Sequence, residues 1–101
     1  MQVTFQAVHF TADQRLKDYI SDKLQKLVKF YPKILQVTVY LKLENSGQVR
    51  DKIVELKLNV PGHTLIASNS DKSFEASFDE GLENIKRQLK KINDKAQQSV
   101  R

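Results

Sequence analysis

Positively charged side chains gather in one short stretch of the sequence, NIKRQLKKINDK, residues 84–95. Its charged residues are five cations, Lys86, Arg87, Lys90, Lys91 and Lys95, and one acid, Asp94. Cations at this density suit the binding of phosphate groups, because each neutralised phosphate releases condensed counterions. Ile85, Leu89 and Ile92 keep helical spacing through the same stretch. We therefore predict a helix with one apolar side and one phosphate-binding side.

Charge is divided unevenly along the segment from Asp71 to Arg101. Residues 71–84 carry five acids and one lysine, a net charge of −4, whereas residues 85–101 carry six bases and one acid, a net charge of +5. The helix dipole favours this polarity, but its influence fades within the first and last turns. Five cations within ten residues also repel one another. A polyanionic partner explains the basic half better than helix stability does, and a merely solvated face remains the alternative.

A second basic group lies near the end of an earlier amphipathic segment, residues 14–31. Its members are Lys23, Lys26, Lys29 and Lys33. Asp22 and Lys26 have the i,i+4 spacing of a helix ion pair, so the first half of this segment is expected to be self-neutralised. The unbalanced positive charge is predicted to lie at the carboxy-terminal end of the helix.

The other polar residues form no catalytic or metal-binding pattern. His9 and His63 are the only histidines, and neither has a cysteine or carboxylate cluster nearby. The acids of segment 79–83 stand beside cations on a helix, where ion pairing is commoner than acid–base catalysis. With three glycines in all, the chain has no phosphate-cradling loop and no nucleophile elbow. We expect no enzymatic activity, no metal and no cofactor.

Aromatic residues offer a further possible contact with nucleic acid. Tyr40, on the polar side of a predicted strand, could stack on a base as in single-strand binders. The sheet lacks the paired aromatics of an RRM, however, so packing on aliphatic neighbours is the favoured interpretation. Phe30 and Tyr31, at the end of the first helix, are interpreted as core or core-edge residues.

Alternating apolar residues predict the strands. Residues 2–8 should bury Val3, Phe5 and Ala7, and residues 35–44 should bury Leu35, Val37, Val39, Leu41 and Leu43. A loop is expected over residues 45–51, with Ser46-Gly47 as its turn signal. Residues 52–68 are predicted to form a hairpin around a type II turn at Pro61-Gly62.

Two helices are predicted from apolar residues at three- and four-residue intervals. The first follows a capping box at residues 11–14 and should end before Pro32, because the residue preceding a proline avoids the α region. The second runs from Phe74 to Ala96, with Asp71 or Ser73 as its cap. Gly81 lies inside it at a cost of about 1 kcal/mol relative to alanine, so close packing is expected there.

The predicted order is β-α-β-β-β-α, an α+β fold. Each helix has one apolar stripe and the sheet has one apolar face, so both helices should pack on the same face of a four-stranded sheet. A parallel pairing of the first two strands would make their connection right-handed.

Size and composition fit one domain over residues 1–101. The chain has 101 residues, a formal net charge of +5, a pI near 9.5 and no cysteine. The charge favours a polyanionic partner, and the absence of cysteine fits a reducing compartment. No apolar run approaches the roughly 20 residues that span a bilayer, and no secretory signal is visible. We expect a cytoplasmic protein without membrane association.

Four stretches carry a family resemblance: KLQKLVKFYPKI (23–34), QVTVYLKLE (36–44), LIAS (65–68) and SFEASFDEGLENIKRQLKK (73–91). Their order and spacing resemble the short ribosome hibernation-promoting factors, also described as ribosome-associated translation inhibitor A or sigma-54 modulation proteins. The resemblance covers essentially the whole chain. Its most specific part is RQLKK, downstream of Ala76 to Asp79. Ser73 and Glu75 depart from the family pattern, so the start of the helix is expected to pack differently.

The resemblance implies a domain like the double-stranded-RNA-binding modules (dsRBD-like). Such factors bind the small ribosomal subunit in the channel used by mRNA and by A- and P-site tRNA, and idle ribosomes in stationary phase or stress without any chemistry. The RNA-binding residues implied by the family motifs are Lys23, Lys26, Arg87, Lys90 and Lys91, to which the helical wheels add Lys29, Lys33, Lys86 and Lys95. Since the chain stops at Arg101, we expect no C-terminal dimerisation domain. A second small hibernation factor is a further candidate partner.

Two other functions stay open at the level of sequence. One is a general RNA-binding module that recognises A-form shape without ribosome specificity. The other is a protein-interaction module that acts on transcription, as the sigma-54 name suggests.

Overall fold

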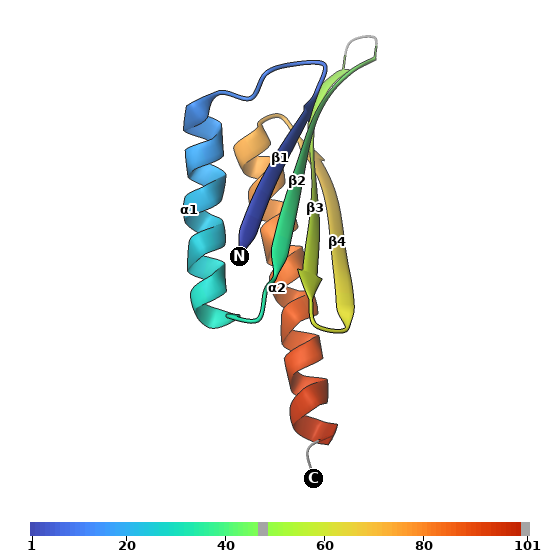
Figure 1. The fold of residues 1–101 in the computed structure, drawn as a ribbon. Coiled ribbons are helices and arrows are strands. Elements are labelled where there is room, and N and C mark those ends of the chain that lie inside the picture. Colours follow the sequence, from blue (N-terminus) through green and yellow to red (C-terminus); the bar gives the residue numbers. More distant parts are fainter. Residues whose placement is uncertain (47–48, 100–101) are drawn as a thin grey trace.

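The computed structural model describes the backbone of residues 1–46 and 49–99, and the side chains of residues 1–44 and 51–94. Its elements are β1 (Gln2–Val8), α1 (Gln14–Phe30), β2 (Gln36–Ser46), β3 (Val49–Val60), β4 (His63–Asp71) and α2 (Phe74–Ser99). The predicted β-α-β-β-β-α order is confirmed. Figure 1 shows α1 and α2 on the same side of the sheet, with α2 extending well past the end of the strands.

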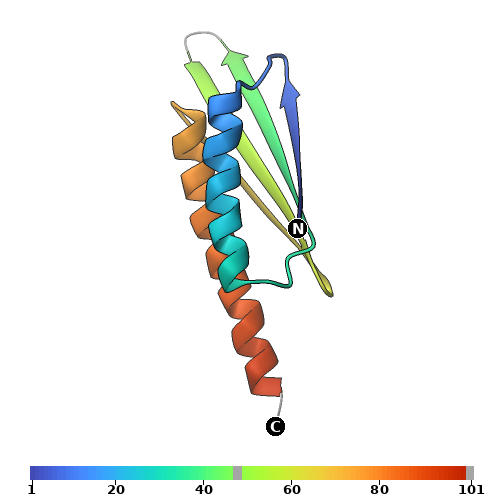
Figure 2. The same cartoon turned by 60° about the vertical axis from the view of Figure 1, so that its left-hand side comes forward.

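The sheet has the strand order β1-β2-β3-β4. β1 pairs with β2 in parallel, and the two later pairs are antiparallel. Figure 2 shows the two layers from the side, with the helices running in the same direction, so that both carboxy-terminal ends lie toward the same end of the molecule. The opposite face of the sheet carries no helix among the described residues.

The core lies between the helices and one face of the sheet. Its fully buried side chains are Ile20, Leu24, Val37, Val39, Leu41, Val54, Leu56, Leu58, Phe78 and Ile85. Each buried side chain of this size stabilises the fold by roughly 1.5–3 kcal/mol relative to exposure. The alternation in β2 and β3 is therefore the signature of a sheet that is covered on one face.

Burial at the ends of β1 and β2 differs from the prediction. Ala7 and Leu35 are exposed, Leu35 to 60%. Leu35 precedes β2, and its N–H is held by the Asn59 carbonyl at 2.8 Å. The neighbouring Ile34 is buried instead, so it fills the core as the chain turns from α1 into the sheet.

The caps of the helices resolve one open question and correct one prediction. The predicted capping box at residues 11–14 is wrong, because Asp13 is the N-cap of α1 and accepts a hydrogen bond from the Leu16 N–H at 2.8 Å. Aspartate is a stronger N-cap than threonine, and Asp13 stands three residues before Leu16, so its carboxylate reaches the N–H of the third helical residue. At α2 the cap is Ser73, whose Oγ accepts from the Ala76 N–H at 3.0 Å.

Of the two predicted turn regions, the structure corrects one and confirms the other. β2 and β3 pair as far as Ser46 and Val49, so most of the predicted loop over residues 45–51 is strand. Gly47 of the predicted turn lies outside the described residues. The Pro61-Gly62 turn is confirmed, and Gly62 has the positive φ, 81°, that a type II turn requires at this position.

Gly81 allows α2 to approach the sheet closely, as predicted. A Cβ at this position would lie 3.3 Å from Leu56 Cδ1 and 3.4 Å from Asn69 Oδ1. One turn earlier, the buried Ser77 donates its hydroxyl proton to the Lys52 carbonyl at 2.6 Å. These contacts hold the first half of α2 against β3 and β4. Because α2 is packed there, its second half extends beyond the end of the sheet.

Candidate nucleic-acid interface

The two basic segments found in the sequence lie at the same end of the molecule. α1 and α2 run in the same direction, so the carboxy-terminal end of α1 lies against α2, whose second half continues past it (Figures 1 and 2). Two grooves, which share two aromatic residues, collect most of the predicted cations.

The first, which we call the interhelical groove, lies between α1 and α2 and encloses about 560 Å³. Its lining residues are Lys23, Lys26, Leu27, Phe30, Tyr31, Asp79, Leu82, Glu83 and Lys86. It therefore joins three of the predicted RNA-binding lysines, two from α1 and one from α2. Two carboxylates in the same groove reduce their net charge.

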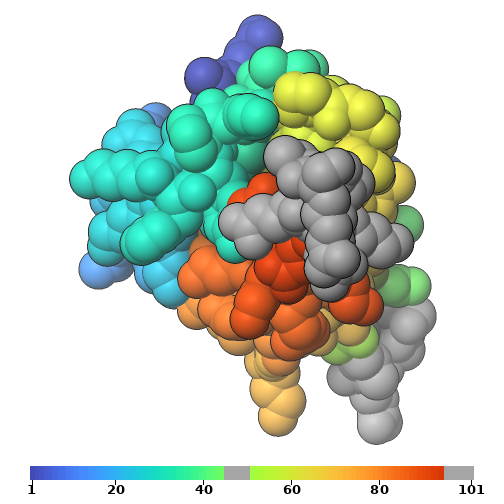
Figure 3. Space-filling view, turned by 90° about the horizontal axis from the view of Figure 1, so that it is seen from below, coloured from blue at the N-terminus to red at the C-terminus, as the bar shows by residue number. Residues whose placement is uncertain are grey.

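The second, which we call the basal groove, lies under the end of the sheet and encloses about 940 Å³. It is lined by residues 30–34, by Val60, Pro61, His63 and Leu65 around the β3–β4 turn, and by Gln88, Leu89, Lys91, Ile92 and Asn93 of α2. Figure 3 looks onto this end of the molecule, where the end of α1, the β3–β4 turn and α2 come together. Lys33 and Lys91 bring positive charge to a mostly apolar lining.

The remaining predicted cations are distributed around these grooves. Lys29, Arg87 and Lys90 are exposed and line neither groove. Lys95 belongs to α2, but its side chain lies outside those that the structure describes. The described cations thus extend along the two helices, from Lys23, which contacts Asp79 in the first half of α2, to Lys91 in the basal groove, and they do not form a single pocket.

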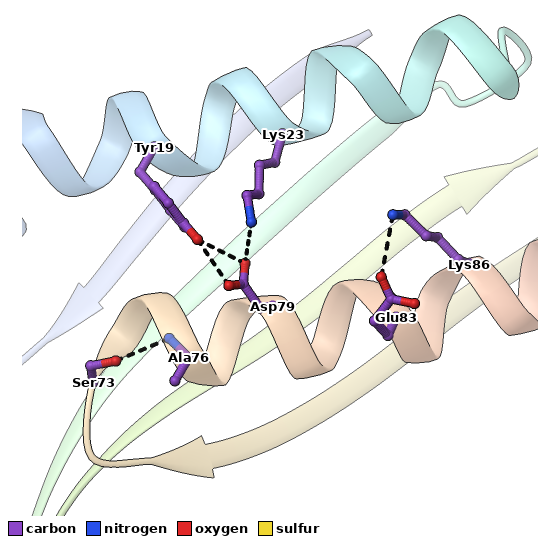
Figure 4. A network of polar contacts seen from close by, with 7 residues as sticks. All are labelled: Tyr19, Lys23, Ser73, Ala76, Asp79, Glu83 and Lys86. Carbon is purple, nitrogen blue, oxygen red and sulfur yellow. Dashed lines mark hydrogen bonds and ion pairs between the residues drawn. The ribbon is translucent and has the colours of Figure 1, made fainter.

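Lys23 differs from the other lysines because it joins the two helices. Its Nζ donates to Asp79 Oδ1 at 2.8 Å and lies 4.7 Å from the centre of the Tyr19 ring. The Tyr19 hydroxyl donates to the same carboxylate, at 2.9 Å to Oδ2 and 3.1 Å to Oδ1 (Figure 4). The hydrogen bond to Asp79, followed by that with Tyr19, raises the pKa of Lys23 above its usual value of 10.5.

Sequence reasoning missed the structural role of this cluster. Tyr19 and Lys23 are spaced i,i+4 on the flank of the α1 stripe, and Asp79 directly follows the buried Phe78. That spacing was a usable signal, because side chains beside an apolar stripe meet the neighbouring helix. Lys23 is accordingly a helix-to-helix contact as well as a cation of the interhelical groove.

The second ion pair among the described side chains joins Lys86 to Glu83 at 3.3 Å (Figure 4). It confirms the expectation that helical acids in this region pair with cations. Both side chains are exposed, so the pair stabilises the protein by no more than about 1 kcal/mol and can exchange for a phosphate contact. The predicted pair between Asp22 and Lys26 does not occur among the ion pairs of residues 1–44 and 51–94.

Phe30 is not a core residue, contrary to the prediction. It is 79% exposed at the last position of α1, whereas Tyr31 is partly buried. Phe30 follows Lys26 by one helical turn and lies beside the stripe that ends in Leu27 and Tyr31, so its ring falls at the rim of the grooves instead of under the sheet. Tyr40 is partly buried in β2, where it alternates with buried neighbours and faces the uncovered side of the sheet.

Other kinds of site have little support in the described part of the chain. No group of three or more His, Cys, Asp or Glu side chains there could hold a metal ion. His9 is an exposed residue with a positive φ of 68°, and His63 lines the basal groove. Among these residues, no helix combines the length and apolarity needed to cross a bilayer.

The fold and these grooves define a two-layer α+β domain with a cationic end. The chain belongs to the family described as sigma 54 modulation protein / S30EA ribosomal protein, whose sequence profile matches residues 3–97. The family resemblance seen in the sequence is thereby confirmed.

Individual relatives cover nearly the whole chain. A ribosome hibernation promoting factor of Pseudomonas putida is 33% identical over 97 residues, which are 96% of this chain and 91% of the relative. A protein of the same name from Klebsiella oxytoca is 30% identical over 98 residues, 97% of this chain and 99% of the relative.

Solved structures share the fold. A ribosomal subunit interface protein from Coxiella burnetii superposes with a TM-score of 0.83 at 17% identity, covering 93% of this chain and 99% of that one. The Protein Y N-terminal domain of Thermus thermophilus gives a TM-score of 0.79 at 19% identity, over 91% and 99% of the two chains. At these identities the likeness establishes the fold alone.

Proposed function

We propose that this protein is a ribosome-binding hibernation factor that inhibits translation without catalysing a reaction. Its cationic end would contact small-subunit rRNA in the channel used by mRNA and by A- and P-site tRNA, and its bulk would exclude those ligands. The observation that carries the proposal is the convergence of lysines from α1 and α2 on one end of the domain. Relatives named ribosome hibernation promoting factor, aligned over 96% and 97% of the chain, support it.

The distribution of charge supports an RNA partner. Of the described RNA-binding candidates, only Lys23 and Lys86 form ion pairs with described side chains, so most of the positive charge at this end is uncompensated within residues 1–44 and 51–94. Of the acids in the first half of α2, Asp79 and Glu83 line the interhelical groove, whereas none of the acids among the described residues lines the basal groove. A domain polarised in this way would approach a phosphate surface with its basic end first.

Ribosomes are the favoured RNA because of the family. A general structured-RNA-binding module would need the same cations, but the aligned relatives are named for ribosome hibernation. Residues 1–101 would act as one ribosome-binding domain in the cytoplasm, where ribosomes are found. A second small hibernation factor remains the candidate for an additional protein partner.

Co-sedimentation with purified small subunits tests the proposal. If about six phosphates are contacted, the affinity should fall on the order of a thousandfold between 50 and 200 mM salt. The double reversal Arg87→Glu/Lys90→Glu should abolish co-sedimentation without unfolding the protein, because both side chains are exposed. A control matched in charge is Lys42→Glu/Lys57→Glu, which reverses two exposed lysines on the uncovered face of the sheet.

Competition experiments separate the alternatives. A ribosome-specific factor should be displaced from small subunits by tRNA and mRNA, and should bind isolated A-form duplexes far more weakly. Equal affinity for duplexes and for small subunits would instead identify a general RNA-binding module. A wild-type protein that stays in the soluble fractions at 50 mM salt would refute the proposal.

A further inference from the structure

An aromatic ridge, formed by Phe30 and Tyr31, separates the two grooves. Both residues line the interhelical groove and also the basal groove. Phe30 is 79% exposed, the most exposed large hydrophobic side chain among the described residues. A phenylalanine left in water forgoes the favourable free energy of burial, so the ridge has an apolar surface available to a ligand.

Cations lie on both sides of this ridge. Lys26 and Lys86 line the interhelical groove on one side, and Lys33 and Lys91 line the basal groove on the other. Each pair joins one lysine from the region of α1 to one from α2. The arrangement is an aromatic surface between two phosphate-binding positions, which is how single-strand binders stack a base while tracking the backbone.

We propose that the ridge binds one unpaired nucleotide of an RNA strand. The base stacks on Phe30, and Tyr31 supports it from the groove wall. The phosphate on one side of the base contacts Lys26 and Lys86, and the phosphate on the other side contacts Lys33 and Lys91. The inference rests on the proposed function and deepens it, because it specifies that the bound RNA includes an extruded or single-stranded base as well as duplex phosphates.

The chemistry of the grooves favours a nucleotide over a peptide. An apolar peptide side chain would use the ring of Phe30 but would give no counter-charge to Lys26, Lys33 and Lys91, which form no ion pair among the described side chains, unlike Lys86, which is paired with Glu83. A nucleotide supplies a flat aromatic surface and a negative charge on each side of it. The basal groove, at about 940 Å³, is also within the size range of small-molecule sites.

Tryptophan fluorescence gives a direct test. The chain contains no tryptophan, so Phe30→Trp would place a single indole on the ridge. The probes are a hexa-adenylate single strand and a stable blunt RNA duplex, compared at equal total phosphate concentration. Stacking should quench the indole emission with the single strand, whereas the duplex should leave it nearly unchanged.

Removing the Phe30 ring should cause a loss of affinity for the single strand. Phe30→Ala should weaken binding of hexa-adenylate by about 5- to 150-fold, the range found when a stacking aromatic is replaced by alanine. The salt dependence should be unchanged, because the phosphate contacts remain. Leu35→Ala is the matched control, since Leu35 is also an exposed apolar residue near the end of α1 but lines neither groove.

The outcomes separate this inference from the proposed function. If wild-type protein co-sediments with small subunits but Phe30→Ala binds hexa-adenylate as tightly as wild type, the nucleotide site is refuted and hibernation stands. Equal quenching of the Phe30→Trp variant by the duplex likewise refutes it. If wild-type protein does not co-sediment but the single strand still quenches the indole of that variant, the nucleotide site stands and the ribosomal function is refuted.

Discussion

Lys23 and Asp79 join the two helices through a 2.8 Å contact between Nζ and Oδ1, at the upper end of the interhelical groove. The same carboxylate accepts a hydrogen bond from the Tyr19 hydroxyl. One acid therefore holds two side chains of α1 against α2, and the relative position of the two basic segments depends partly on it. The cluster connects the stability of the domain to the geometry of the cationic end.

Replacing Asp79 with asparagine should weaken this connection. The Lys23 and Asp79 side chains are 36% and 43% exposed, which limits the value of the ion pair to about 1 kcal/mol or less. The hydrogen bond from Tyr19 adds on the order of 1 kcal/mol. We expect Asp79→Asn to lower the free energy of unfolding in urea by about 1–2 kcal/mol. Glu83→Gln, which removes the more exposed pair, should change it by less than about 0.5 kcal/mol.

The pH dependence of stability offers a second test. Because the folded protein holds the pKa of Lys23 above 10.5, the charged lysine stabilises the fold at every pH below that value. This contribution should be lost as the pH rises through the folded-state pKa. The difference in unfolding free energy between wild type and Lys23→Met should be constant from about pH 6 to 9 and shrink above about 10.5.

The cap of α1 can be tested with a pair of variants. Asp13→Ala removes the oxygen that accepts the Leu16 N–H and should cost about 1 kcal/mol of stability. Thr11→Ala, which alters the residue predicted from sequence to cap α1, should cost less than about 0.5 kcal/mol. Thermal unfolding of both variants measures the difference. Equal losses would mean that the capping box operates in solution.

At Gly81, helix propensity and packing oppose each other. Alanine would improve the propensity of α2 by about 1 kcal/mol. Its Cβ would lie 3.3 Å from Leu56 Cδ1, and Leu56 is fully buried and cannot move without disturbing the core. Overpacking costs typically about 1–3 kcal/mol, so we expect Gly81→Ala to destabilise the protein by about 1 kcal/mol in urea. A stabilised variant would show that the contact relaxes easily.

The fold could be predicted from the sequence because its apolar residues are strictly periodic. Val37, Val39 and Leu41 alternate along a strand, and Ile20, Leu24 and Leu27 recur along a helix, so a single assignment buries them all. The burial of Leu35 was predicted wrongly, because this residue continues the apolar alternation but lies before the start of β2, where no helix covers it. Periodicity describes faces of elements and does not show where the covering element ends.

The cationic end could be predicted only in part. A cluster such as Lys86 to Lys91 can be recognised directly in the sequence. An ion pair between two helices cannot, so the pairing of Lys23 with Asp79 was not predicted. The exposure of Phe30 was also missed, because an aromatic residue beside an apolar stripe is usually buried. Its position depends on how α1 ends relative to α2, which no local pattern encodes.

Glu83 provides a test in which a substitution should improve binding. Its carboxylate accepts a hydrogen bond from Lys86 at 3.3 Å and holds a negative charge within the interhelical groove. If that groove receives RNA phosphates, Glu83→Gln removes both a competitor for Lys86 and a repulsive charge. We expect affinity for small subunits to rise about 2- to 5-fold at low salt, which corresponds to the energy of one exposed ion pair.

The gain should diminish as salt shortens the screening length from about 10 Å at 0.1 M to about 3 Å at 1 M. Glu55→Gln provides the control, because Glu55 lies between buried Val54 and Leu56 and therefore faces the uncovered side of the sheet. It changes net charge by the same amount at a place far from both grooves. Equal gains from the two substitutions would show that net charge alone sets the affinity, and would remove the interhelical groove from the binding surface.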